Sequence, residues 1–338
     1  MNLETYLIPA PVPAVTAPTA VELLASAGLD WTVHKRPLAA LIDQGPGRLP
    51  QVVDAAPHVA LVAELADGPV VLSAPKRGYE PFQNSDLAEL ADRLHSAGAV
   101  GAPERVEVMR GGRVVLVHCA AEGFTLGETD ETKRYTVLGM SHDGTLPLFA
   151  VSLATRMFCQ NQLVSMAAKG VGGIRVRHTS GMRVRLDQAE EAVARSTALA
   201  QDFERHARRL AGRTITLYQA LAFWRLAWST LSAEPDGQHA PLDADRRAWS
   251  RWDGRRAAAT DAWLRTYNDE SEALPGVAWT GWLAFNAVTR WIDNERVVRR
   301  SGGRTEAEAR AYAALFGSAA RAKTKVLALA LQSMGGRA

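Results

Sequence analysis

Apolar and polar residues alternate along several short segments in the first half of the chain, a pattern that predicts half-buried strands. Three pairs of such segments share one design, with two alternating runs on either side of a tight turn. The pairs are residues 58–65 with 69–74 around Asp67-Gly68, 105–110 with 113–119 around Gly111-Gly112, and 135–141 with 146–157 around Asp143-Gly144. Because Asp-Gly and Gly-Gly are typical of turns that join antiparallel strands, we expect three β-hairpins.

Two helices and one further strand are predicted in the same half. Thr19 and Glu22 form a capping-box pattern at the start of the first helix, which should end just before Gly28. A second helix is expected from residue 85 to about residue 95. Residues 29–38 alternate in the manner of a strand, in which Pro37 limits pairing, so this segment is expected at a sheet edge or to end there.

The hydrophobic period changes to that of amphipathic helices at about Leu186, and it keeps this form to the end of the chain. The segments that follow helical spacing are residues 186–210, 216–231, 243–268, 276–299 and 305–334, the last with a possible break at Gly317. The second half of the chain is therefore predicted to be helical.

Together these elements predict an α+β fold, since hairpins with a few interposed helices are typical of antiparallel sheets. We expect a mostly antiparallel, curved sheet with helices on one face, followed by an all-helical C-terminal half. The change of period divides the chain into an α+β sheet domain over residues 1–185 and a helical domain or subdomain over residues 186–338.

The composition fits a globular protein, with 338 residues of which 47% are hydrophobic and 22% charged. No run of roughly 18 apolar residues indicates a membrane span, and the N-terminus lacks a basic leader. Cys119 and Cys159 are too few for a disulfide framework and lack zinc-ligand spacing, so buried free thiols in the cytoplasm are expected. The net charge of +3 permits a phosphate-rich partner without requiring one.

Seven sequence blocks stand in order along nearly the whole chain. They are residues 29–38, 79–84 (Tyr-Glu-Pro-Phe-Gln-Asn), 141–144 (Ser-His-Asp-Gly), 156–161 (with Cys-Gln-Asn), 174–179, 282–289 and 315–321. The set resembles the phage- and plasmid-borne family catalogued as domain of unknown function 932. That resemblance implies a mobile-element setting, in which DNA replication, recombination or defence against host systems are the usual tasks. A looser resemblance, in topology only, links helices on a curved antiparallel sheet to single-strand annealing proteins of recombination.

A basic stretch follows the third hairpin and contains no acidic residue between Lys169 and Arg185. Its candidate nucleic-acid-binding residues are Arg156, Lys169, Arg175, Arg177, His178, Arg183 and Arg185. On a strand, Arg175 and Arg177 would share one face, where guanidinium groups can pair with successive phosphates. The alternative is an ordinary solvated strand face.

A second candidate is a polar site formed by His142, Asp143, Gln160 and Asn161. Neighbouring strand residues point to opposite faces, so Ser141, His142 and Asp143 cannot form a catalytic relay directly. Asp143-Gly144 has the residues that a tight hairpin turn needs, and Asn161 suits the cap of a helix. Turn and cap chemistry therefore compete with the interpretation as a binding site.

Eight tryptophans lie in the helical half: Trp224, Trp228, Trp249, Trp252, Trp263, Trp279, Trp282 and Trp291. Their helical spacing is typical of core packing, whereas exposed members could stack on bases. Asn286 and Asp293 are polar positions within the same apolar stripe, and they either bond to neighbouring helices or mark a site.

No phosphate loop, dinucleotide fingerprint, zinc spacing or nucleophile elbow occurs. The acids Glu104, Glu107, Asp130 and Glu131 show no convergent set, so we expect no enzyme, catalytic residue, metal or cofactor. The leading hypothesis is a single-stranded nucleic-acid-binding, strand-annealing protein of recombination or replication that forms homo-oligomers. The alternative hypothesis is an interaction protein that counters a host defence, of the anti-restriction type, and uses exposed aromatic residues.

Overall fold

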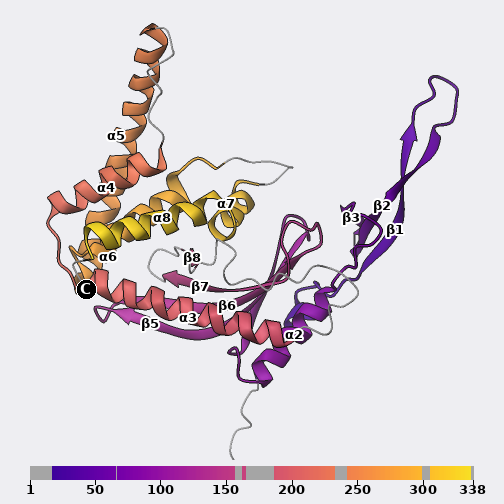
Figure 1. The fold of residues 1–338 in the computed structure, drawn as a ribbon, viewed down its shortest axis with the longest axis horizontal. Helices are drawn as coiled ribbons and strands as arrows, with labels where there is room; N and C mark the ends of the chain where they lie inside the picture. Colours follow the sequence, from indigo (N-terminus) through magenta and orange to yellow (C-terminus); the bar gives the residue numbers. More distant parts are fainter. Residues whose placement is uncertain are drawn as a thin grey trace, which may run out of the picture.

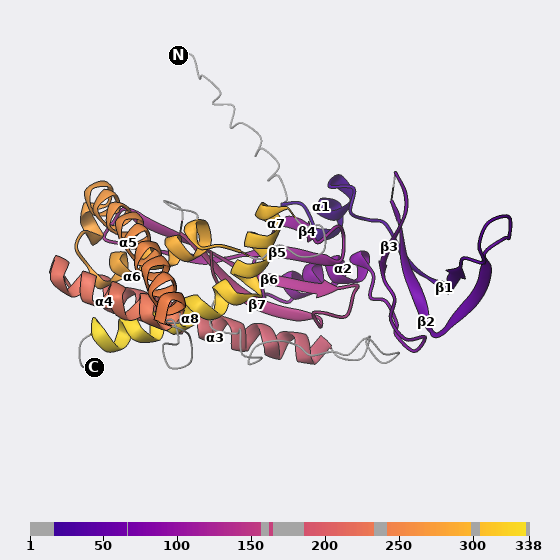
Figure 2. The same ribbon diagram turned by 90° about the horizontal axis from the view of Figure 1, so that it is seen from above.

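The structure of the protein is a computed structural model, and it describes residues 17–65, 67–156, 162–164, 186–232, 242–298 and 305–335 (Figure 1). The fold is α+β with a helical C-terminal half, as predicted, but the antiparallel strands form two sheets and not the single sheet expected. Figure 2 shows most of the C-terminal helices at one end, the larger sheet in the middle and the hairpin of the first two strands at the other end.

The smaller sheet has the order β1-β2-β3, formed by β1 (Val33–Ile42), β2 (Gln51–Leu65) and β3 (Gly68–Ser73). Leu65 pairs with Gly68, so the hairpin around Asp67-Gly68 is confirmed. A small core of Val33, Leu61, Ala63 and Leu72 holds this sheet together at its base.

The larger sheet has the order β4-β5-β6-β7-β8, with each strand antiparallel to the next. Its strands are β4 (Pro103–Met109), β5 (Val114–Leu126), β6 (Asp130–Ser141), β7 (Phe149–Arg156) and β8 (Gln162–Val164). The hairpins predicted around Gly111-Gly112 and Asp143-Gly144 are both present. Between them, β5 and β6 form a longer hairpin, which the sequence pattern did not predict.

Helices pack on both faces of the larger sheet, and not on one face as predicted, because a helix near the end of the C-terminal half also contacts the sheet. Helix α1 (Ala20–Ser26), helix α2 (Asn84–Ser96) and the start of α3 (Leu186–Ala211) share one buried cluster with the sheet, which includes Val115, Val117 and Leu138. The opposite face buries Leu116, Val137 and Leu153 against Leu315 of helix α7 (Glu306–Leu315). The α1 cap follows the prediction, because Thr19 accepts from the backbone N–H of Glu22 and the Glu22 carboxylate accepts from that of Thr19.

The C-terminal half forms the helices expected from the change of period. They are α3, α4 (Leu217–Leu231), α5 (Leu242–Ala273), α6 (Gly281–Arg290), α7 (Glu306–Leu315) and α8 (Ser318–Ser333), with the break at Gly317. The helix predicted from residue 276 begins later, because Pro275–Val277 form a 3-10 turn and Thr280 caps α6. A π-helical turn, Trp291–Glu295, follows α6.

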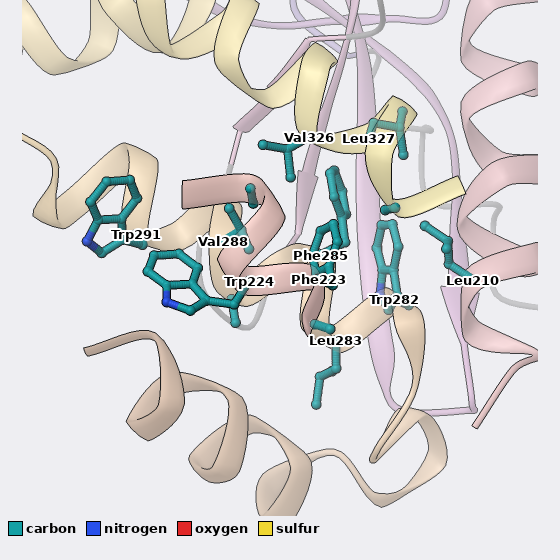
Figure 3. Packing of buried hydrophobic residues seen from close by; sticks show 14 of the residues in the cluster. Leu210, Phe223, Trp224, Trp282, Leu283, Phe285, Val288, Trp291, Val326 and Leu327 are labelled. Carbon is teal, nitrogen blue, oxygen red and sulfur yellow. The ribbon is translucent and has the colours of Figure 1, made fainter. Parts of the chain in front are cut away.

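The largest core lies in this helical half and extends onto the sheet. Trp224, Trp282, Phe285 and Val326 pack together in it (Figure 3). Phe124, Leu126 and Ala154 of the sheet belong to the same cluster, so the helices are packed against the far end of β5 and β7. Core packing is thus confirmed for six of the tryptophans, which are buried: Trp224, Trp228, Trp252, Trp263, Trp282 and Trp291. Trp279, in contrast, is 43% exposed.

Candidate functional site

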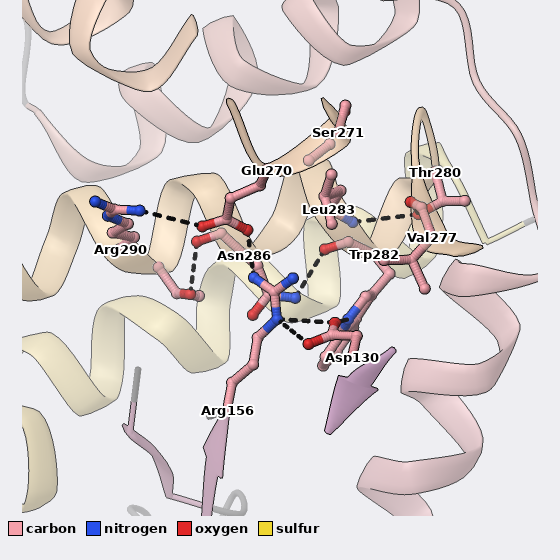
Figure 4. A network of polar contacts seen from close by, with 12 residues as sticks. Asp130, Arg156, Glu270, Ser271, Val277, Thr280, Trp282, Leu283, Asn286 and Arg290 are labelled. Carbon is pink, nitrogen blue, oxygen red and sulfur yellow. Dashed lines mark hydrogen bonds and ion pairs between the residues drawn. The ribbon is translucent and has the colours of Figure 1, made fainter. Parts of the chain in front are cut away.

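A buried network of charges lies where the larger sheet meets the helical half (Figure 4). Arg156, the last residue of β7, has no solvent exposure. Its Nε donates to both carboxylate oxygens of Asp130, at 2.7 and 2.8 Å, and its Nη1 donates to Glu270. Asp130 opens β6, and Glu270 lies in the last turn of α5, so the guanidinium joins elements from both halves of the chain.

Helix α6 completes the network along one of its faces. Trp282, Asn286 and Arg290 are spaced four residues apart, which places them on the same side of the helix. The indole Nε1 of Trp282 donates to Asp130 at 2.7 Å, and Asn286 donates to the backbone carbonyl of Trp282 at 2.9 Å. Arg290 reaches Glu270 at 3.5 Å from the side that is open to solvent.

A close backbone contact holds these elements in place. Gly127, in the turn between β5 and β6, touches Gly276 in the 3-10 turn before α6. A Cβ atom added at Gly276 would lie 1.7 Å from the carbonyl oxygen of Gly127, so neither position tolerates a side chain without movement of the backbone. This contact brings Asp130, the first residue of β6, within hydrogen-bonding distance of Trp282 on α6.

The charges of the network balance, with two carboxylates, Asp130 and Glu270, facing two guanidinium groups, Arg156 and Arg290. Buried ion pairs of this kind are strongly destabilised when one partner is lost. The prediction that Arg156 binds nucleic acid is therefore wrong, because its guanidinium is buried and compensated by carboxylates that the fold brings from distant positions. Its role in this structure is to join the sheet to the helices.

The other predicted nucleic-acid-binding residues lie outside the described residues: Lys169, Arg175, Arg177, His178, Arg183 and Arg185. The same holds for Gln160 and Asn161 of the predicted polar site. The elements on either side of the basic stretch are described: one is a strand of the larger sheet, and the other is a helix packed against it. Strand β8 pairs with β7, and Ala189 and Val193 near the start of α3 pack into the cluster that covers the sheet.

His142 and Asp143 of the predicted polar site have separate structural partners. His142 is buried, with its Nε2 2.9 Å from the side-chain oxygen of Asn84 and its ring 5.5 Å from that of Trp31. The Asp143 carboxylate accepts from the backbone N–H of Thr145 at 3.0 Å and pairs with Arg110 at 2.9 Å. Asp143 thus lies in the connection between β6 and β7, but this loop is longer than the predicted tight turn, since the last strand pair is Gly139 with Phe149.

The family is decided by a match to a family model. The model described as "Domain of unknown function (DUF932)" matches residues 71–315. The chain belongs to this family. No curated protein and no solved structure matches it, so the looser likeness to single-strand annealing proteins is not confirmed.

Side-chain hydrogen bonds join several of the blocks by which the chain resembles the DUF932 family. Gln83 accepts from the backbone N–H of Val33 at 2.8 Å and donates to the Val33 carbonyl at 3.1 Å. Tyr79 donates to the carbonyl of Ser141 at 3.2 Å, next to the contact of Asn84 with His142. The blocks at 29–38, 79–84 and 141–144 therefore form one structural junction, although the first lies outside the matched residues.

Two further ionisable clusters in this DUF932 chain could not be seen in the sequence. His118 on β5 is buried, and its ring lies 3.3 Å from Glu107 and 3.2 Å from Arg105, both on β4. Burial lowers the pKa of His118, while the hydrogen bond from His118 lowers the pKa of Glu107.

The other cluster joins the π-helical turn to α8. Lys323 donates to the Asp293 carboxylate at 2.9 Å, and burial raises the pKa of Asp293 and lowers that of Lys323. Asp293 thus bonds to a neighbouring helix, one of the two roles predicted for it.

The described part of the chain shows neither a metal-binding cluster nor a membrane-spanning helix. Among its residues, no group of three or more His, Cys, Asp and Glu side chains is arranged to hold a metal ion. Within the same residues, no helix combines the length and the apolar character needed to cross a membrane.

Proposed function

We propose that the chain is a single-stranded nucleic-acid-binding protein of a phage or plasmid, which anneals strands in recombination or replication. The observation that carries this proposal is the basic stretch without acidic residues, from Lys169 to Arg185. The elements that flank it, β8 and α3, are both held on the larger sheet. A cationic segment with fixed ends can follow a phosphate backbone, since Arg and Lys pair with phosphate oxygens without reading the bases.

Five permanent cations define the proposed contact: Lys169, Arg175, Arg177, Arg183 and Arg185. Arg156 is not among them, because it is committed to Asp130 and Glu270. Neutralising backbone charge on two complementary strands lowers their mutual repulsion, which is the physical requirement for annealing. Contacts of this type release counterions, so binding should weaken steeply as salt rises.

Fluorescence anisotropy with labelled single- and double-stranded oligonucleotides tests the proposal at two salt concentrations. We expect preferential, salt-sensitive binding to the single strand, and weaker binding by the variant Arg175→Ala/Arg177→Ala. The matched control is Arg195→Ala/Arg205→Ala, which removes the same charge from exposed positions of α3. If the wild-type protein binds no oligonucleotide at low salt, the proposal fails. Equal losses in the two variants would also count against it, because only net charge would then matter.

Annealing is tested separately, by mixing complementary labelled strands and following their energy transfer. The protein should accelerate duplex formation, and Arg175→Ala/Arg177→Ala should slow it in proportion to the lost binding. Binding without acceleration would reduce the function to single-strand binding.

The alternative proposal is an interaction protein that counters a host defence. One observation favours it, namely the exposed aromatic side chains Tyr218 and Trp279 in the helical half. Large exposed apolar patches on soluble proteins mark interaction sites, and contacts with other proteins are among these. This alternative becomes the leading one if no oligonucleotide binds at low salt.

A further inference from the structure

The hairpin of β1 and β2 extends beyond the body of the molecule, as both ribbon views show (Figures 1 and 2). We call residues 38–58 the arm. Every residue of the arm is exposed or half-buried, and β3 pairs with β2 only from Leu61 onwards. Over residues 39–54 the two strands are paired only with each other in the described structure, so both outer edges of the ribbon are open.

The arm is apolar on both of its faces. Leu41 pairs with Val52, and the neighbouring pair is Ala40 with Val53. Because successive strand residues point to opposite faces, these pairs lie on opposite sides of the ribbon, and Ile42 shares the side of Val53. Leu41 is 71% exposed and Val52 is 67% exposed. Strands that are apolar on both faces are typical of positions buried on both sides, so this ribbon is suited to insertion between other elements.

A second exposed apolar surface lies at the opposite end of the molecule, on α4 and the turn before α6. Its exposed apolar side chains are Leu217, Tyr218, Leu226 and Trp279, and we call these four residues together the end patch. Tyr218 is 78% exposed, and Leu226, eight residues further along α4, also lies on the solvent side of this helix. The carbonyl of Trp279 accepts from the backbone N–H of Ile215, which places this tryptophan beside the start of α4.

The arm and the α4 part of the end patch carry charges of opposite sign, whereas α5 places the exposed acids Asp269 and Glu272 next to the residues that contact Trp279. The arm carries exposed Asp43 and Asp54 against a single exposed guanidinium, Arg48. Exposed Arg225 lies on α4 within the end patch, and exposed Arg213 lies just before that helix. Opposite charges at the rim of an apolar contact steer association and fix its register.

We infer that the arm of one molecule inserts against the end patch of a second copy of the same chain. The two surfaces differ from each other and lie at opposite ends, so the contact is heterologous, with each molecule using its arm on one neighbour and its end patch on another. Repetition of such a contact produces a ring if the rotation closes and a filament if it does not. The inference does not rest on nucleic-acid binding, and its test contains no nucleic acid.

Sedimentation velocity of the full chain, over micromolar to submillimolar concentrations, tests the inference with two variants. The arm variant is Leu41→Ser/Val52→Ser, and the end variant is Tyr218→Ser/Leu226→Ser; all four positions are exposed, so folding should persist. Wild-type protein should assemble, and each variant alone should have a dissociation constant at least about tenfold higher, as expected for lost apolar contacts. Val21→Ser, at an exposed apolar position of α1, is the control and should assemble like the wild type.

Mixing the two variants gives the decisive result. The end variant keeps an intact arm and the arm variant keeps an intact end patch, so the mixture should form one contact and stop at a one-to-one dimer. A wild-type protein that stays monomeric overturns the inference, as does assembly that the arm variant does not weaken. If the end variant alone assembles like the wild type, the arm binds a surface other than the end patch, and the inference is equally overturned.

Discussion

Replacing Arg156 with methionine tests the buried charge network directly. The guanidinium has no solvent exposure, and the substitution leaves Asp130 and Glu270 buried without their main counter-charge. Trp282 still donates to Asp130, while Arg290 lies 3.5 Å from Glu270 and is partly exposed, so neither replaces the lost charge. Loss of one partner of a buried ion pair costs about 3–5 kcal/mol, a large part of the ~5–15 kcal/mol that stabilises a typical domain.

Urea unfolding, followed by tryptophan fluorescence and by circular dichroism, measures this loss. The control is Arg195→Met on α3, which removes an exposed i,i+4 pair with Glu191 and should cost at most about 1 kcal/mol. The triple variant Arg156→Met/Asp130→Asn/Glu270→Gln should regain much of the stability, because it no longer buries uncompensated charge. If Arg156→Met costs no more than the control, the network does not join the sheet to the helices and the reasoning is refuted.

Two other predictions concern stability. Burial lowers the pKa of His118 below its ordinary value near 6.5, so the unfolded chain binds a proton at this residue more readily than the folded chain. The free energy of unfolding is therefore unaffected by protonation of His118 above that value and decreases as the pH falls below it. His118→Gln should therefore flatten the dependence of unfolding free energy on pH between about 7.5 and about 5.5, and equal slopes in both proteins would contradict this. Gly276→Ala should destabilise the protein by roughly 1–3 kcal/mol or more in urea unfolding, because its Cβ meets the Gly127 carbonyl. Gly254→Ala, in an open position on α5, should instead stabilise it by about 0.5–1 kcal/mol, and a similar effect of the two substitutions would argue against the close contact.

Local signals in the sequence account for most of the fold. Turn residues such as Asp67-Gly68 and Gly111-Gly112 predicted three hairpins, and the capping box of Thr19 predicted the start of α1, because these interactions involve residues a few positions apart. The extension of the first strand to Ile42 was not predicted. Residues 38–42 are continuously apolar, so the alternation of apolar and polar residues that identifies a half-buried strand is absent from them.

The candidate site was less predictable, for a physical reason. Charge counted along the chain placed Arg156 with the basic stretch, whereas the fold pairs it with Glu270, 114 positions away. Asp130 was likewise grouped with other acidic residues and not with Arg156, because the two lie 26 positions apart in the sequence. His118 and Glu107 are neighbours only because β4 and β5 pair in a specific register. Interactions that depend on strand register or on contact between the two halves leave no local signal.

The salt dependence of single-strand binding tests the central proposal most directly. Plotting the logarithm of the binding constant against that of the salt concentration should give a slope of about −3.5 if five cations contact phosphates, at about 0.7 per contact. Arg175→Ala/Arg177→Ala should lower the magnitude of this slope by about 1.4, whereas Arg195→Ala/Arg205→Ala should leave it nearly unchanged. A wild-type slope near zero, or an unchanged slope in the Arg175→Ala/Arg177→Ala variant, would contradict the proposal that this stretch binds the phosphate backbone.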